Sequence, residues 1–285
     1  MTAQILDGKA LAKTMSRELA EQVAAFEQAH GWAPGIAVVQ VGADPASSWY
    51  VKQINKSFTG VGMRFALHTL EADAQADALT GLIQQLNADP QTNGIIVQMP
   101  LPKHLPQSLV TDTLDPRKDV DGIHPINAGR LLQQSGDFYA PATPAGGMEI
   151  LRRYGIDLKG KHAVMVGRSN IVGRPMALLM LHEHATVTIC HSRTRDLQSI
   201  TRQGDILVAA IGKAKMITAD MIRPGAVVID FGVNVVDDKL QGDVDTEAAM
   251  EVAGYITPVP GGTGPMTNVM LITNTLTAAR RQVGE

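Results

Sequence analysis

The sequence predicts an α/β protein of two domains built on mostly parallel sheets. Strand-like apolar runs alternate with helical patterns along the chain, glycine or proline ends most of the runs, and 285 residues suffice for two domains. Hydrophobic residues make up 45% and charged residues 19%, as in ordinary globular proteins. A net charge of −3 without a long basic run argues against a nucleic-acid-binding surface.

The composition also bears on the compartment. Cys190 is the single cysteine, so the chain cannot form an intrachain disulfide, and a reducing compartment fits best. The first 15 residues lack the apolar region and cleavage pattern of a signal peptide. No apolar run approaches the roughly 20 residues of a membrane span. We therefore expect a cytoplasmic enzyme with no membrane partner.

The first α/β series runs from residue 35 to residue 100. A β-branched run ends at Gly42, and Asp44 and Pro45 are typical of the N-cap and first position of a helix. A second amphipathic helix is expected over 75–89. The predicted strands of this series cover 35–42, 65–70 and 94–100.

A polar, proline-punctuated stretch over 114–130 has no helical period and is interpreted as a functional loop. The change in composition near 135–143 marks the expected domain boundary, and a helix is expected over 143–155. The chain shows no internal repeats.

The second series begins near residue 161. A helix is expected over 170–184, a glycine- and proline-rich loop over 255–267, and a closing helix over 268–282. The predicted strands of this series cover 161–167, 185–190, 205–212 and 225–232.

The strand–turn–helix stretch over 164–177 is a candidate dinucleotide site. It carries Gly167 and Gly173 but does not match the G-x-G-x-x-G pattern. Gly167 permits a tight turn, and the N-terminus of the following helix presents N–H groups to a pyrophosphate. A structural turn in which Gly173 only packs on the sheet is an equal alternative.

The end of the next strand favours NADP over NAD. An acidic residue usually binds the ribose 2′-hydroxyl of NAD at this point. Here the strand runs into His191, Ser192 and Arg193, and Arg168 lies in the first turn. Guanidinium groups pair well with a 2′-phosphate. The alternative is that the arginines after this strand are simply solvated.

Polar residues at strand ends suggest a catalytic cluster. Gln98 follows a parallel strand, where α/β active sites collect, and Asp119 and Asp121 lie in the loop beyond it. Each could instead have a structural role, Gln98 as a strand-end cap and the aspartates as turn formers.

These stretches, in this order, resemble the bifunctional methylenetetrahydrofolate dehydrogenase/methenyltetrahydrofolate cyclohydrolase family. The resemblance rests on "LDGKALA", "VGADPAS", "GIIVQMPLP", "DPRKDVDG", "TPAG", "VGRSNIVGRPMA", "ATVTICHSRT", "DFGVN" and "PVPGGTGPMT". It implies a folate-side α/β domain (1–140 plus 268–285), a Rossmann-like NADP-binding domain (141–267), and an active site in the cleft between them. It also implies a homodimer built through the nucleotide-binding domains.

The resemblance further implies roles for individual residues. Tyr50, Gln98 and Asp121 would form the catalytic cluster around 5,10-methylenetetrahydrofolate, with Asp121 holding the pterin N–H groups. Further folate contacts would be Pro100, Pro258, Gly261 and Gly262. NADP contacts would be Gly167, Arg168, Ser169, Ile171, Gly173, Ser192, Arg193 and Val233.

One position departs from the family pattern. The family helix carries Tyr-x-x-x-Lys, and the lysine serves the cyclohydrolase step; here Ile54 stands four residues after Tyr50. On a helix, Lys56 lies about 120° and Lys52 about 160° from Tyr50, so we expect both to be solvated. Gln53 is closer, but an amide cannot replace an ammonium group. We therefore expect dehydrogenase activity with cyclohydrolase activity lost or weak.

Three alternatives remain open. Another group could replace the lysine and leave the enzyme bifunctional. The substrate could have changed to another iminium compound within an NADP-dependent oxidoreductase. The chain could also be a catalytically silent folate or NADP binder. No Cys/His spacing typical of a metal site is present, so none is expected.

Overall fold

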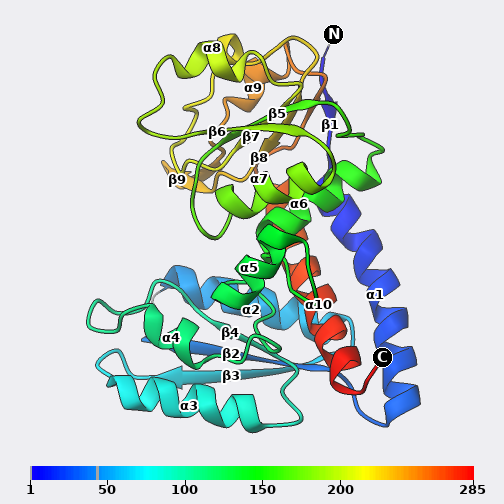
Figure 1. Ribbon diagram of the computed structural model, residues 1–285, viewed down its shortest axis with the longest axis vertical. Helices are drawn as coiled ribbons and strands as arrows, with labels where there is room; N and C mark the ends of the chain where they lie inside the picture. The colour runs from blue at the N-terminus through cyan, green and yellow to red at the C-terminus, as the bar shows by residue number, and fades with distance from the viewer. Residues whose placement is uncertain (1, 43–44) are drawn as a thin grey trace. The chain divides into compact units, whose positions relative to one another are not determined.

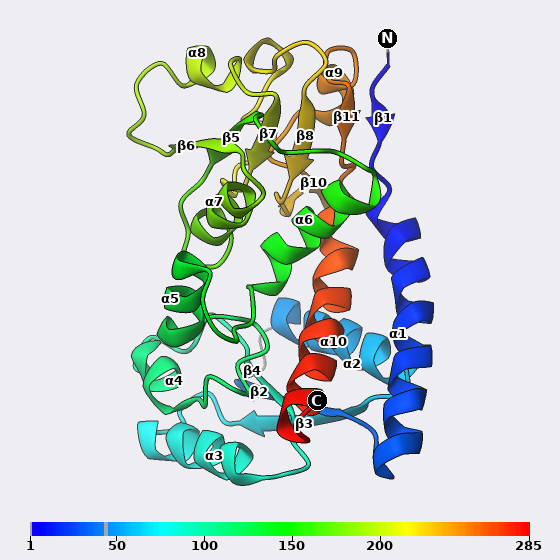
Figure 2. The same cartoon turned by 45° about the vertical axis from the view of Figure 1, so that its right-hand side comes forward.

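The computed structural model describes residues 2–42 and 45–285, and the expected N-cap Asp44 lies outside them. The chain divides into two compact units. Unit 1 comprises Met1–Lys13 and Thr143–Thr267, and unit 2 comprises Thr14–Ala142 and Asn268–Glu285. The boundaries fall inside or beside helices α1 (Gly8–His30), α6 (Ala142–Arg153) and α10 (Thr263–Gln282), which are labelled in Figures 1 and 2.

Unit 1 is built on a six-stranded sheet with the order β1-β11-β8-β7-β5-β6, in which every paired strand is parallel. Its strands are β1 (Gln4–Ile5), β5 (His162–Val166), β6 (Thr186–Cys190), β7 (Ile206–Ala209), β8 (Val227–Asp230) and β11 (Tyr255–Ile256). The central strands β7 and β8 are buried along their whole length, and all their residues except Asp230, the last of β8, are apolar, as expected for a parallel sheet covered on both faces.

The N-terminal segment corrects the expected domain boundary. We expected residues 1–140 to form one domain, but the first 13 residues belong to unit 1. The cause is β1, which pairs in parallel with β11 through Gln4 and Ile5. Leu6 N extends this pairing by donating to Ile256 O, and Ala3 N donates to Met250 O, just before β11 in the chain.

Helices and a hairpin complete unit 1. Helix α7 (Gly173–His182) packs against β5 and β6. The other elements are α8 (Leu197–Thr201), the 3₁₀ helix η1 (Ala219–Met221), α9 (Thr246–Ala249) and an antiparallel hairpin formed by β9 (Asn234–Val236) and β10 (Lys239–Gln241).

Unit 2 holds a three-stranded parallel sheet with the order β3-β2-β4. Its strands are β2 (Gly35–Val41), β3 (Arg64–Leu70) and β4 (Gly94–Val97), and its helices include α2 (Pro45–Gly60), α3 (Ala76–Ala88), α4 (Ser108–Thr113) and α5 (Pro125–Gln133). The core under α3 and α4 contains Val39, Leu79, Ile83 and Val110, all fully buried.

The α/β class with parallel sheets is confirmed. Two local expectations were wrong. The predicted loop 114–130 contains the start of α5, where Pro125 occupies the first turn and the His124 ring accepts a hydrogen bond from Ile126 N. The closing helix begins at Thr263 instead of residue 268. Among the described residues, no helix is long and apolar enough to span a membrane.

Candidate active site

Helix α2 presents Tyr50 at the edge of its buried face. Tyr50 is half-buried, whereas Ile54, one turn later, is 0% exposed and Phe58 is buried below it. Lys52 and Lys56 are exposed, as their angular positions predict. The helix therefore turns an apolar stripe inward, and neither visible lysine shares the side of Tyr50.

Gln98 lies where β4 ends. Its backbone N–H donates to Val39 O of the neighbouring parallel strand (2.8 Å), and its side chain is buried. Pro100 follows a cis peptide bond and is exposed. The predicted position of Gln98 at the carboxyl edge of the sheet is thus confirmed, although its catalytic role stays a prediction.

The chain beyond β4 carries the two aspartates. Asp119 is fully buried, and its carboxylate accepts from the backbone N–H groups of Ile123 and His124 and from Asn127 Nδ2 at 2.7 Å. Burial raises the pKa of Asp119 despite these donors. The Asp119 carboxylate therefore anchors the loop through hydrogen bonds to its own neighbours.

The charge of Asp121 acts on Tyr50. Burial, with a contribution from the charge of Asp119, raises the pKa of Asp121 to about 7. Burial and the charge of Asp121 raise the pKa of Tyr50, so the phenol keeps its proton at neutral pH. A donor hydroxyl and a carboxylate that titrates near neutrality are thus held in one region of unit 2.

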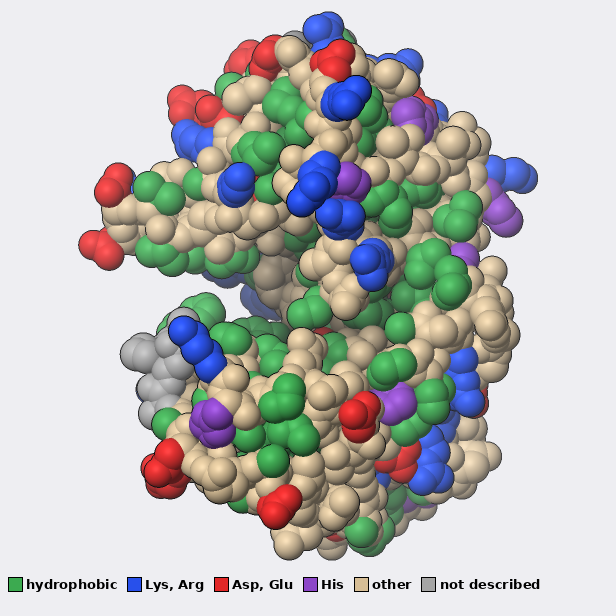
Figure 3. Space-filling view, turned by 60° about the vertical axis from the view of Figure 1, so that its left-hand side comes forward, with side chains coloured by type: hydrophobic (Ala, Val, Ile, Leu, Met, Phe, Trp, Pro, Cys, Tyr) green, Lys and Arg blue, Asp and Glu red, His purple; other side chains and the backbone are tan. Residues whose placement is uncertain are grey.

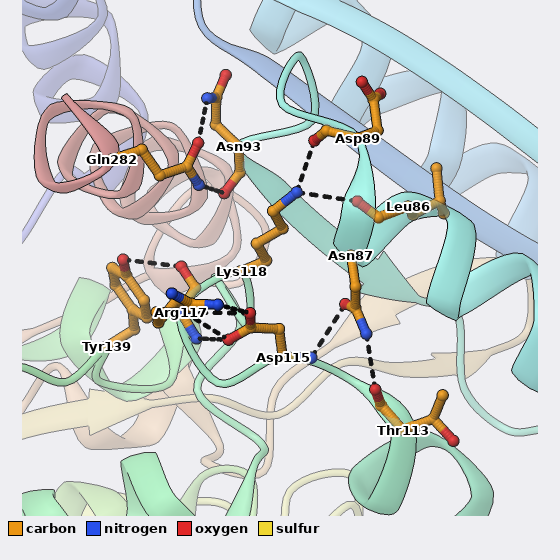
Figure 4. Close-up of polar contacts among 10 residues, drawn as sticks. All are labelled: Leu86, Asn87, Asp89, Asn93, Thr113, Asp115, Arg117, Lys118, Tyr139 and Gln282. Carbon is orange, nitrogen blue, oxygen red and sulfur yellow. Dashed lines mark hydrogen bonds and ion pairs between the residues drawn. The ribbon is translucent and has the colours of Figure 1, made fainter.

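Lys118 connects this loop to α3 and β4. Its side chain is 7% exposed, and Nζ donates to Leu86 O (3.0 Å) and Asp89 O (2.6 Å) at the end of α3, as Figure 4 shows. Burial lowers the pKa of Lys118. Its own carbonyl accepts from Ile95 N of β4 at 2.7 Å. The residue joins helix, strand and loop directly before the two aspartates.

Other contacts in Figure 4 brace the start of the same loop. Asn87 donates to Thr113 O (2.7 Å) and accepts from Asp115 N (3.0 Å). The Asp115 carboxylate pairs with Arg117, and the Tyr139 hydroxyl donates to Arg117 O at 3.1 Å. None of these groups was singled out from sequence, because each contact joins residues far apart or lies within an ordinary-looking turn.

In unit 1, the turn after β5 requires its two glycines. Gly167 has φ +131°, and a Cβ there would lie 2.2 Å from Ala210 O. A Cβ on Gly173 would lie 2.5 Å from Gly167 O, so α7 packs directly on the turn. This close approach is what a dinucleotide-binding βα turn needs.

The ends of β5 and β6 bring the predicted NADP contacts to one edge of the sheet. Val166 pairs with Cys190, and Gly167 N donates to Cys190 O, so Arg168 and Ser192 follow from adjacent strands. The side chains of Arg168, Ser169, Ile171, Ser192 and Arg193 are exposed. Figure 3 shows Lys, Arg and His side chains close together on one face of unit 1. The guanidinium groups of Arg168 and Arg193 and the hydroxyl of Ser192 are suited to a phosphorylated ribose.

Ser169 already caps α7. Its Oγ accepts from Val172 N (3.1 Å) and Gly173 N (3.2 Å), which leaves its hydroxyl proton available to a phosphate oxygen. Val233 lies apart from this cluster, after β8, and its side chain is 67% exposed.

Two buried aspartates organise the neighbouring loops and were not found from sequence. The Asp243 carboxylate accepts from Ile211 N, Gly212 N (3.0 Å) and Lys213 N (2.9 Å) in the loop after β7. Asp230 accepts from three backbone N–H groups, including Val244 N at 2.9 Å, and burial raises its pKa to about 6. Their pattern, D…GDVD, resembles ordinary turn residues.

The loop 257–262 is held at both ends on Asp230. Thr257 Oγ1 accepts from Asp230 N, and Thr263 Oγ1 donates to Asp230 O, each at 2.8 Å. Gly261 has φ +105°, and a Cβ on Gly262 would lie 2.5 Å from Pro258 O. Among the described residues, no group of three or more His, Cys, Asp or Glu side chains could hold a metal ion.

The parallel sheet, the glycine turn and the basic strand ends define a Rossmann-like, nucleotide-binding α/β protein. Residues 6–121 match the family model described as the tetrahydrofolate dehydrogenase/cyclohydrolase catalytic domain, and residues 141–283 match its NAD(P)-binding domain. The chain therefore belongs to the tetrahydrofolate dehydrogenase/cyclohydrolase family.

Individual relatives cover almost the whole chain. This chain is 54% identical over 281 residues to the bifunctional protein FolD of Herpetosiphon aurantiacus, and the match covers 98% of each chain. The crystal structure of the bifunctional FolD dehydrogenase/cyclohydrolase from Campylobacter jejuni is similar, with a TM-score of 0.96, 42% identity and coverage of 98% and 99%. The Trypanosoma brucei dehydrogenase-cyclohydrolase, complexed with NADP cofactor and an inhibitor, matches with a TM-score of 0.96, 37% identity and full coverage of both chains.

Proposed function

We propose that this protein oxidises 5,10-methylenetetrahydrofolate to the 5,10-methenyl form with NADP, and that its cyclohydrolase activity is lost or weak. Membership of the family supports the dehydrogenase reaction. The observation that carries the second statement is Ile54, a fully buried apolar side chain one turn after Tyr50. No ammonium group is available at that point of α2.

The dehydrogenase step depends mainly on holding two rings face to face. Bound NADP would supply the hydride acceptor. Arg168 and Arg193, with Ser192, would hold its 2′-phosphate at the ends of β5 and β6. The Gly167 turn lets the backbone approach the pyrophosphate.

On the folate side, Asp121 binds the pterin N–H groups and orients the ring. Tyr50, which keeps its proton, packs along the substrate and donates a hydrogen bond. Gln98 offers an amide at the carboxyl edge of the sheet. None of these groups has to accept the hydride or transfer a proton during oxidation.

The hydrolytic step has different requirements. Water must be activated and aimed at the bridge carbon, and protons must then move. Isoleucine neither donates nor accepts a proton. Lys52 and Lys56 are exposed on other sides of α2, so they do not substitute for the missing group.

A paired assay tests the proposal on one preparation. NADP-linked oxidation of methylenetetrahydrofolate is followed first, and then the loss of methenyltetrahydrofolate without nucleotide is compared with the uncatalysed rate. We expect clear oxidation and hydrolysis close to the uncatalysed rate. Hydrolysis as fast as oxidation would show that another group replaces the lysine.

The variant Ile54→Lys adds the missing ammonium group and should raise hydrolysis above that of the wild type. Lys56→Met is the matched control, because it removes an exposed charge from the same helix and should leave both rates unchanged. Oxidation of another cyclic imine in preference to the folate would support the altered-substrate alternative. The expected homodimer stays a prediction that analytical ultracentrifugation can test.

A further inference from the structure

An unpaired acceptor lies in the second turn of α10. Oδ1 of Asn268 is shielded from solvent and has no hydrogen-bond partner among the described residues. Such atoms are uncommon, since most buried polar atoms in proteins are paired. This one therefore calls for a physical explanation.

The orientation of the amide follows from its neighbour. The Ser57 hydroxyl donates its single proton to Gln53 O at 2.8 Å, one turn back on α2. Ser57 Oγ can then only accept, and Asn268 Nδ2 donates to it at 3.4 Å. Turning the amide over would place Oδ1 against an oxygen that has no proton to give. Oδ1 therefore points away from Ser57.

The position of Asn268 relates it to the folate-side residues. Ser57 lies seven residues after Tyr50, about 20° away around the helix, so both occupy the same edge of α2. Further along α10, Asn274 Nδ2 donates to Val120 O (2.8 Å) and Ala140 O (3.1 Å), beside Asp121. Figures 1 and 2 both show α10 running past α2. Helix α10 thus contacts the Tyr50 helix and the Asp121 loop.

We infer that Asn268 is a substrate-binding residue whose Oδ1 accepts a hydrogen bond from an N–H group of the bound folate. A carbonyl oxygen selects a donor, and reduced folates carry N–H groups on the pterin ring and in the glutamate amide. Leaving the acceptor unpaired destabilises the free protein, and binding the donor removes this cost. The inference rests on the proposed folate substrate.

The test separates binding from stability. In Asn268→Leu, a side chain of similar size loses both polar atoms. We expect the Kd for tetrahydrofolate, measured by titration calorimetry, to rise about tenfold, which corresponds to about 1.4 kcal/mol. The Kd for NADP should not change, and the thermal unfolding temperature should stay equal or rise, because an unpaired buried acceptor has been removed.

The matched control is Ser57→Ala, which removes the partner of Nδ2 but leaves Oδ1 in place. Its folate affinity should fall less than threefold. If Asn268→Leu is unstable, Asn268→Ala gives the same comparison with a smaller side chain.

Two results would overturn the inference. Unchanged folate affinity in both Asn268 variants would show that Oδ1 does not contact the substrate. A lower unfolding temperature together with weaker NADP binding would show a structural role instead. If the wild type itself fails to bind tetrahydrofolate, the proposed function fails, and this outcome is distinguishable because it precedes any variant.

Discussion

Asp121 should give the dehydrogenase a pH dependence near neutrality. Burial and the charge of Asp119 raise the pKa of Asp121 to about 7 in the free protein. The carboxylate accepts pterin N–H groups best when it is ionised, and it ionises as pH rises through this value. We therefore expect kcat/KM for methylenetetrahydrofolate to increase with pH between 6 and 8.

The size of the effect follows from the ionised fraction. With a pKa of about 7, roughly one Asp121 in eleven is ionised at pH 6 and roughly ten in eleven at pH 8. If only the ionised form binds substrate productively, kcat/KM changes about tenfold over these two pH units. Because kcat/KM for the folate reports the enzyme form without bound folate, the pKa of Asp121 before folate binds is the relevant one.

The assay follows NADPH formation at low folate and saturating NADP, so that titration of the cofactor phosphate does not contribute. Asp121→Asn is the control, since its amide does not titrate. Its kcat/KM should be flat from pH 6 to 8 and about 10- to 100-fold below the wild type at pH 8, as expected for loss of a charged acceptor. A flat wild-type profile, or the same slope in the variant, would refute this reasoning.

Three further outcomes are expected. Arg193→Ala should raise KM for NADP about tenfold but leave KM for NAD unchanged, measured by initial rates with each cofactor; an equal loss with both would contradict the assignment of the 2′-phosphate. Gly167→Ala should abolish measurable NADP binding by calorimetry, because its Cβ would lie 2.2 Å from Ala210 O; near-normal affinity would show that the turn can yield. Lys118→Met should lower the free energy of unfolding by about 2 kcal/mol through the unpaired carbonyls at the end of α3, and urea denaturation with no change would contradict that role.

Most of the longer strands were predictable from sequence, because β2, β4, β5 and β7 are mainly apolar runs with glycine or proline close behind them. The shorter elements were not. The four residues of α9 and the two residues of β1 are too few for a periodic pattern to form. Helix α10 begins at Thr263 although Gly264 and Pro265 follow, since proline is tolerated in the first turn of a helix.

Only some residues of the candidate site could be predicted from the sequence. Residues that end strands, such as Gln98 and Ser192, could be placed from local pattern alone. The resemblance supplied the expected roles of Tyr50 and Asp121, and the structure supplied the electrostatic environment that surrounds them. Asn268 could not be anticipated, because its contact with Ser57 joins positions 211 residues apart.

The division of the chain has a consequence for folding during synthesis. Unit 2 contains the last 18 residues, and Asn93 beside β4 exchanges hydrogen bonds with Gln282 near the end of α10. The ribosome produces all of unit 1 before these residues emerge. The nucleotide-binding unit can therefore fold first, although most of unit 2 is translated earlier. The early part of unit 2 keeps the surface that packs against α10 uncovered until that helix has been synthesised.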